Sequence, residues 1–292
     1  MSAIVLGESV FPLNEDGSVF HLGLCPGELA ETVILVGDPE RVPMVSRYFD
    51  HIELKRQKRE FVTHTGSFSG RRISVISTGI GTSNIDIVLN EVDALHNIDF
   101  VRRQVRARAV TLDIIRLGTC GGLQAECQPG KLVVSFYAVG FDAVLGHYSF
   151  PKEPDVEAFY QVVEAAYERY PFGSAIYAAK ASTHWCEKFR CLGQAGITLT
   201  CPGFYGPQHR GLRLSGIEQD IFSCGSDIEY RGFSVQNLEM ETAMILGLGA
   251  ALGHRCASLS TVVFNRVSEQ VVDNLPACID TMIEKALQIV VD

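Results

Sequence analysis

The chain has 292 residues, of which 47% are hydrophobic and 20% are charged, and its 34 acidic and 25 basic residues give a formal net charge of −9. This composition excludes a disordered or fibrous chain, and the acidic balance argues against nucleic acid or an anionic membrane as a partner. No apolar run approaches the roughly 18–20 residues that a membrane-spanning helix needs, and residues 1–11 lack the basic segment of a secretory signal. The 9 cysteines include no C-x-x-C pair, so we expect free thiols and a cytoplasmic protein.

Short apolar runs alternate along the chain with longer helical patterns. The runs predict strands at residues 33–37, 73–78, 113–118, 131–139, 176–181, 233–239 and 256–264. Apolar stripes and terminal signals predict helices at residues 85–95, 155–167, 241–252 and 274–291. This alternation favours an α/β domain with helices flanking a largely parallel or mixed sheet.

Two segments do not fit the alternation. Residues 183–200 are rich in Cys, Gly and Arg without a clear period, and we interpret them as a surface excursion. Residues 99–111 form a cluster of positive charge, and in an acidic protein we expect a solvated helix or loop insertion there rather than a nucleic-acid patch. The cluster consists of Arg102, Arg103, Arg106 and Arg108.

Glycine-rich turns follow three of the predicted strands, and the ligands of α/β sheets bind at such strand ends. After the first strand, Gly37 permits close backbone approach and Arg41 could bind an oxyanion, although a plain strand-to-helix turn has the same pattern. After the second, Gly79 and Gly81 are followed by Asn84, where a dinucleotide-binding fingerprint needs glycine. The chain also lacks a P-loop motif, so a turn suited to a small anion is the remaining interpretation.

The third turn follows Arg116, an arginine in an otherwise apolar strand, and contains Thr119. A buried arginine is costly unless it pairs with an anion or a carboxylate, so a phosphate ligand and a structural ion pair are both open. Three strand ends that carry cations or hydrogen-bond donors in one domain together indicate a phosphate site.

Two carboxylates stand close together at a predicted strand-to-helix junction, where Glu239, Met240 and Glu241 follow one another. They could accept hydrogen bonds from sugar hydroxyls, with Met240 as an apolar surface for a furanose ring. An acid/base pair of the glycosidase type and two carboxylates that merely face the helix dipole are the alternatives.

A polar loop with aromatic residues, FYGPQHR, occupies residues 204–210. Gln208 offers one acceptor and two donors, and Arg210 offers donors only, a set that complements the imide edge of uracil. Phe204 could stack on the same ring. An ordinary polar loop is the alternative.

These segments, in this order, resemble the nucleoside phosphorylase family and, within it, the uridine phosphorylases. The matching pieces are VFHLGL (19–24), GDPERV (37–42), REF (59–61), STGIG (77–81), RLGTCGG (116–122), FYGPQHR (204–210), NLEMET (237–242) and NR (265–266). The resemblance implies a single-domain three-layer α/β/α sandwich around a central mixed, partly barrel-like β-sheet. Residues 1–18 would be an N-terminal extension and residues 19–292 the nucleoside phosphorylase domain.

The resemblance also implies a role for each matching residue. The phosphate-binding residues would be Gly37, Arg41, Arg59, Arg116 and Thr119. The ribose-binding residues would be His21, Glu239, Met240 and Glu241, with Phe20 closing that end. The base-binding residues would be Phe204, Gln208 and Arg210. The catalytic residues would be Arg116, Gln208, Arg210 and Glu241. His21 and Arg59 would come from a neighbouring subunit of a homodimer or of a hexamer of dimers.

The implied activity is the reversible phosphorolysis of uridine, with deoxyuridine and thymidine as further substrate candidates. Purine-specific members carry an Asp near the position of Asn265, so this residue favours a pyrimidine. A purine nucleoside phosphorylase, a nucleosidase and a catalytically silent nucleoside-binding paralogue are the alternatives.

Phosphate would be a co-substrate, and no cofactor is expected. Two positions depart from the family pattern: Cys120 stands where Ser or Thr is common, and Asn84 replaces the Ser that, with a Glu matching Glu60, binds a monovalent cation in some members. We therefore predict no metal.

Overall fold

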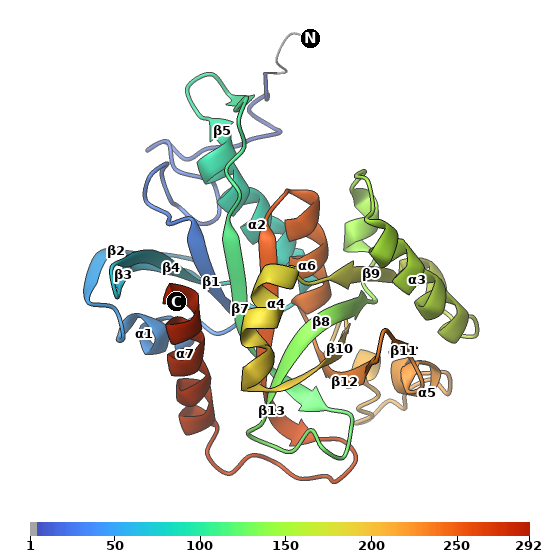
Figure 1. Cartoon of the computed structure of the whole chain (residues 1–292). Coiled ribbons are helices and arrows are strands. Elements are labelled where there is room, and N and C mark those ends of the chain that lie inside the picture. The colour runs from blue at the N-terminus through green and yellow to red at the C-terminus, as the bar shows by residue number, and fades with distance from the viewer. Residues whose placement is uncertain (1–4) are drawn as a thin grey trace.

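The computed structural model describes residues 5–292, and its main element is a mixed β-sheet (Figure 1). Every predicted strand is present within a few residues of its expected bounds. These strands are β1 (Thr32–Val36), β4 (Arg71–Ser77), β7 (Asp113–Gly122), β8 (Leu132–Gly140), β9 (Tyr177–Lys180), β12 (Phe233–Glu239) and β13 (Arg255–Asn265). The sheet also contains β2 (His51–Lys58), β3 (Phe61–Phe68), β10 (Gln194–Thr200) and β11 (Glu229–Tyr230), none of which the sequence patterns predict.

The sheet is parallel at its centre and closes on itself at one side. Strands β4, β1, β7 and β13 lie side by side in parallel, so their carboxyl ends meet at one edge. Strands β7, β13, β8, β10 and β12 form a ring, because β12 pairs with β10 on one side and with β7 on the other. The mixed, partly barrel-like sheet is therefore confirmed.

Helices cover both faces of the sheet, as the α/β pattern predicts (Figure 1). Helices α1 (Arg41–Ser46) and α4 (Thr183–Phe189) both contact α7 (Leu275–Val291) on one face. Helices α2 (Thr82–Asn97) and α6 (Thr242–Ala251) pack together on the other, beside α3 (Pro154–Ala166). Helix α6 is buried on all sides and ends before Gly253, which has the positive φ of 85° typical of a helix C-terminus. The short α5 (Ile221–Gly225) follows the 204–210 loop.

The prediction of a surface excursion at residues 183–200 is wrong. Helix α4 buries Trp185 and Phe189, and β10 is a strand inside the ring, with Ile197 and Thr198 fully buried. The signal was hidden because polar side chains fill interior positions. Thr198, for example, donates a hydrogen bond to Asn237 Oδ1 (2.8 Å).

The arginine-rich segment is a mostly exposed hairpin of β5 (Ile98–Asp99) and β6 (Gln104–Val105), so its solvent exposure is confirmed, although it is neither a helix nor a plain loop. That it is an insertion stays a prediction. The N-terminal segment packs against it: Leu6 N donates to the Arg103 carbonyl oxygen (2.8 Å), and the Phe11 ring meets Phe100 edge-on at 5.0 Å. Phe11 is buried, so this part of the chain joins the body of the domain. A boundary at residue 18 stays a prediction.

In the described range, 5–292, none of the helices combines the length and the apolar character needed to cross a membrane.

Candidate active site

A cavity of about 690 Å³ opens where the carboxyl ends of β1, β4, β7, β12 and β13 converge. Residues from the three glycine-rich turns, from the glutamate junction and from the 204–210 loop all line it. They include Gly37, Arg41, Gly79, Arg116, Thr119, Phe204, Gln208, Glu239, Met240 and Glu241. Segments that are up to 200 residues apart in the chain therefore form one site, because parallel strands bring their ends to the same edge of a sheet.

Two arginines lie at the buried end of this cavity. Arg41 is only 8% exposed, and its Nη1 donates to the Leu117 carbonyl oxygen (3.2 Å). Its Nε has no hydrogen-bond partner within residues 5–292. Burial, together with the nearby charge of Arg116, lowers the pKa of Arg41 to about 10. A buried guanidinium with a free donor and a depressed pKa would be stabilised by an anion.

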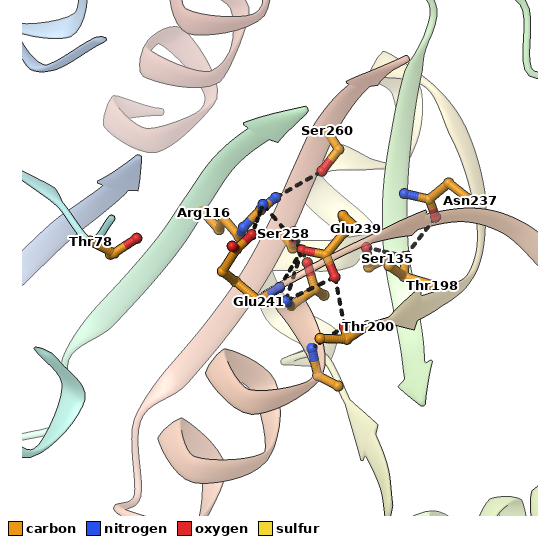
Figure 2. Close-up of polar contacts among 12 residues, drawn as sticks. Thr78, Arg116, Ser135, Thr198, Thr200, Asn237, Glu239, Glu241, Ser258 and Ser260 are labelled. Atoms are coloured by element: carbon orange, nitrogen blue, oxygen red, sulfur yellow. Dashed lines mark hydrogen bonds and ion pairs between the residues drawn. The ribbon is translucent and has the colours of Figure 1, made fainter. Parts of the chain in front are cut away.

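Arg116 is held by two carboxylates (Figure 2). Its Nη2 lies 2.6 Å from Glu241 Oε2 and 3.1 Å from Glu239 Oε2, and its Nη1 donates to Ser260 Oγ (3.0 Å). Burial by itself would lower the pKa of Arg116, but the charges of both carboxylates outweigh that effect and raise it. The structural ion pair that the sequence left open is therefore present, and it lies inside the cavity.

The glycine at position 118 is required by this arrangement. The Arg116 side chain lies along its own strand, so a Cβ on Gly118 would overlap the guanidinium. Any larger residue would displace Arg116, and the RLG sequence thus specifies where the positive charge lies.

The other end of the cavity is formed by the 204–210 loop and is more exposed. Phe204 is 43% exposed, whereas Gln208 is buried. The Arg210 guanidinium lies between two rings, 4.0 Å from the centre of Phe204 and 4.5 Å from that of Phe264. Arg210 also donates to Gln208 Oε1 and to the Phe204 carbonyl oxygen. It does not line the cavity but contacts three residues that do, Phe204, Gln208 and Phe264.

Sequence reasoning missed part of the lining. Ile80, Leu238, Val263 and Phe264 also line the cavity. Phe264 packs so closely on Gly121 that a Cβ there would overlap its ring. Its place at the end of a β-branched strand, next to Asn265, is a signal that could have identified it.

Similarity to known proteins agrees with this geometry. The family model described as "Phosphorylase superfamily" matches residues 31–291. The chain belongs to this superfamily. A uridine phosphorylase of Escherichia coli (strain K12) is 30% identical over 87% of this chain and 88% of the relative, and one of Thermococcus kodakarensis is 29% identical over 89% and 82%. The crystal structure of a Trypanosoma brucei nucleoside phosphorylase, whose title reports uridine phosphorylase activity, aligns with a TM-score of 0.84 at 29% identity, covering 96% of this chain and 99% of that one.

Two residues of this phosphorylase that the resemblance places in the site lie outside the lining of the cavity. His21 Nδ1 pairs with Glu91 Oε1 at 2.6 Å. Arg59 is exposed, with a positive φ of 55°, in the β2–β3 hairpin. The two segments are joined, because Lys58 Nζ donates to the Phe20 carbonyl oxygen (2.6 Å).

Asn265 also has no free hydrogen-bonding groups to offer a base. Its amide nitrogen donates to the carbonyl oxygens of Gln124 (2.7 Å) and Cys127 (2.9 Å), and its oxygen accepts from Val267 N and Ser268 N. In this phosphorylase Asn265 therefore holds two loops together.

Cys120 lines the cavity, and burial raises the pKa of its thiol to about 12, so it is a neutral group. Within residues 5–292, no group of three or more His, Cys, Asp or Glu side chains has the arrangement of a metal site.

Proposed function

We propose that this chain is a uridine phosphorylase, a pentosyltransferase that converts uridine and phosphate reversibly to uracil and α-D-ribose 1-phosphate. The observation that carries the proposal is the single cavity that is lined by two buried arginines, by Glu241 and Met240, and by Gln208 and Phe204. Phosphate, pentose and pyrimidine each have a matching surface in this cavity.

Phosphate binds at the arginine end. Arg41 and Arg116 provide charge, and the turn at Gly37 and the hydroxyl of Thr119 provide further donors. Glu241 accepts hydrogen bonds from ribose hydroxyls, which fixes C1′ in front of the phosphate. Positioning of two reactants in this way can lower a barrier by about 7–11 kcal/mol without a covalent intermediate.

The phosphate oxygen attacks C1′ with inversion as the bond to the uracil nitrogen lengthens. The sugar becomes cationic in character, and negative charge accumulates on the leaving base. Gln208, with the adjacent Arg210, stabilises that charge, which is larger in the transition state than in the bound substrate. Phosphate is the co-substrate, and we expect no cofactor.

A neighbouring subunit completes the site by supplying Arg59 to the phosphate and His21 to the ribose 5′-hydroxyl, near Phe20. Two observations support this part of the proposal. Arg59 and His21 lie outside the cavity of their own chain, and the Lys58–Phe20 hydrogen bond holds their segments together, so one partner could present both. We propose a homodimer, or a hexamer built from such dimers.

The test is ultraviolet monitoring of uridine, deoxyuridine, thymidine and inosine, each with and without phosphate. We expect uridine to be cleaved only when phosphate is present. Cleavage without phosphate would identify a nucleosidase, and preferential cleavage of inosine would identify a purine phosphorylase. Uridine binding without product would identify a silent nucleoside-binding protein. Each of these results overturns the proposal.

A further inference from the structure

The carboxylate of Glu239 has an unusually complete set of hydrogen-bond donors (Figure 2). Its Oε1 accepts from Thr200 Oγ1 (2.6 Å) and from Thr242 N (3.0 Å). Its Oε2 accepts from Glu241 N (2.9 Å) and again from Thr242 N (2.9 Å), and it lies 3.1 Å from Arg116 Nη2. The side chain is buried.

An ionised carboxylate has about four lone-pair positions for hydrogen bonds. In Glu239, hydrogen-bond donors of the protein and the Arg116 guanidinium occupy these positions. In Glu241 the protein occupies only two, because Oε1 accepts from Gly81 N (2.7 Å) and Oε2 pairs with Arg116 (2.6 Å). The two glutamates therefore differ in what they can offer a ligand, although both line the cavity.

The Arg116 guanidinium has the complementary arrangement. A guanidinium carries five N–H donors. Hydrogen bonds to Glu241 and Ser260 occupy two of them, and Nη2 also lies 3.1 Å from Glu239 Oε2 as an ion pair. About two donors remain for a ligand. Their direction depends on Glu239, whose carboxylate is itself held by three backbone and hydroxyl donors.

We infer that Glu239 is not a ligand of the sugar but a positioning residue, which holds Arg116 in the orientation that receives phosphate and leaves Glu241 to accept from the ribose hydroxyls. This inference rests on the proposed function, and it departs from the role that the family resemblance implies for Glu239.

The test combines Glu239→Gln with removal of substrate hydroxyls. Glu239→Gln removes the negative charge beside Arg116, and of the groups facing this side chain only the Thr200 hydroxyl can accept from the glutamine NH₂. Arg116 therefore loses the charged partner that orients it. We expect the KM for phosphate to rise about 10-fold or more. The loss in kcat/KM should be the same, within about threefold, for uridine and for its 2′-, 3′- and 5′-deoxy analogues. In Glu241→Gln, by contrast, most of the loss should disappear with the analogue that lacks the bonded hydroxyl.

Two outcomes would overturn the inference: an unchanged KM for phosphate in Glu239→Gln, or a loss that disappears when one hydroxyl is removed. Thr242→Val is the matched control. It removes a buried hydroxyl that bonds only Ser258 Oγ (2.8 Å) and keeps the backbone N–H that reaches Glu239. If this control raised the KM for phosphate equally, the effect would be general loosening of the turn, and the inference would fail.

A second pair of variants covers the case in which Glu239→Gln does not fold. Thr200→Val removes one donor from Glu239 and keeps its charge, whereas Thr200→Ser keeps the hydroxyl. We expect a KM for phosphate raised about threefold in the first variant and restored in the second; equal values would contradict the inference.

Phosphate-induced stabilisation separates this inference from the proposed function. If the wild type does not cleave uridine, the proposed function fails, but added phosphate should still raise the Tm of the wild type and raise that of Glu239→Gln much less. Equal increases would overturn the positioning role.

Discussion

The two ends of the cavity are built in different ways. At the arginine end, Arg116, Glu239 and Glu241 are buried and connected through their charges. At the base end, Phe204 and Arg210 belong to a loop that is partly exposed, and residues 211–219 after it are exposed. The first end is fixed by the sheet, and the second depends on a loop. The buried charges of the cavity thus have a rigid support in the sheet, whereas Phe204 and Arg210 lie on a partly exposed loop.

The largest effect should follow from replacing Arg116. Arg116→Met leaves two buried carboxylates without their cation, which costs about 3–5 kcal/mol of unfolding free energy. We expect the Tm to fall by roughly 10 °C and kcat/KM for uridine to fall by about 10³-fold or more. Calorimetry and steady-state kinetics would measure both. An unchanged Tm would show that the ion pairs do not stabilise the fold.

A methyl group at position 118 should affect activity more than stability. Gly118→Ala pushes the Arg116 guanidinium out of place, and we expect kcat/KM to fall about 10²-fold. Gly146→Ala is the control, because a Cβ there meets no atom within 4 Å and its φ is not positive. Wild-type kinetics in Gly118→Ala would contradict the placement of Arg116.

Arg210, at the other end of the cavity, should also affect activity more than stability. We expect Arg210→Ala to lower kcat by about 10²-fold, since it removes stabilisation of the leaving base, and to change the Tm by less than about 2 °C. Arg210→Lys keeps the charge but not the two-pronged guanidinium, and it should recover only part of the loss. A kcat near that of the wild type in Arg210→Ala would remove Arg210 from the mechanism.

The smallest signal is expected from mixing two inactive variants. If subunits share sites, Arg59→Ala and Gly118→Ala chains exchanged at equal amounts should regain about a quarter of the wild-type activity, because half of the dimers are mixed and each has one intact site. Exchange would be confirmed by mass spectrometry of differently tagged chains. Confirmed exchange without recovery would count against shared sites.

The sequence predicted a buried strand well where the strand is a continuous apolar run. Strand β1, which is a continuous apolar run, agrees with its predicted bounds to within one residue. Strand β10 has no such run, because two of its buried positions are Thr198 and Thr200, which donate hydrogen bonds to Asn237 and Glu239. Polar residues that bond across a closed ring give a surface-like pattern in a buried strand.

Contacts between residues that are distant in sequence also limited the prediction of the site. The resemblance of the motifs to nucleoside phosphorylases predicted that Arg116, Gln208 and Glu241 lie together, and the structure brings all three to one cavity. It could not distinguish Glu239 from Glu241, because the difference lies in how many protein donors each carboxylate meets. That number depends on Thr200 and Gly81, which are distant in sequence.

The central claim is that the buried arginines deliver phosphate to C1′ of a uracil nucleoside. Phosphorus-31 NMR of the enzyme with uridine and phosphate tests it most directly, because the product ester has its own resonance. We predict that the signal of α-D-ribose 1-phosphate grows in step with free uracil and disappears when uracil is added in excess. Uracil released while inorganic phosphate stays the only phosphorus signal would contradict the account.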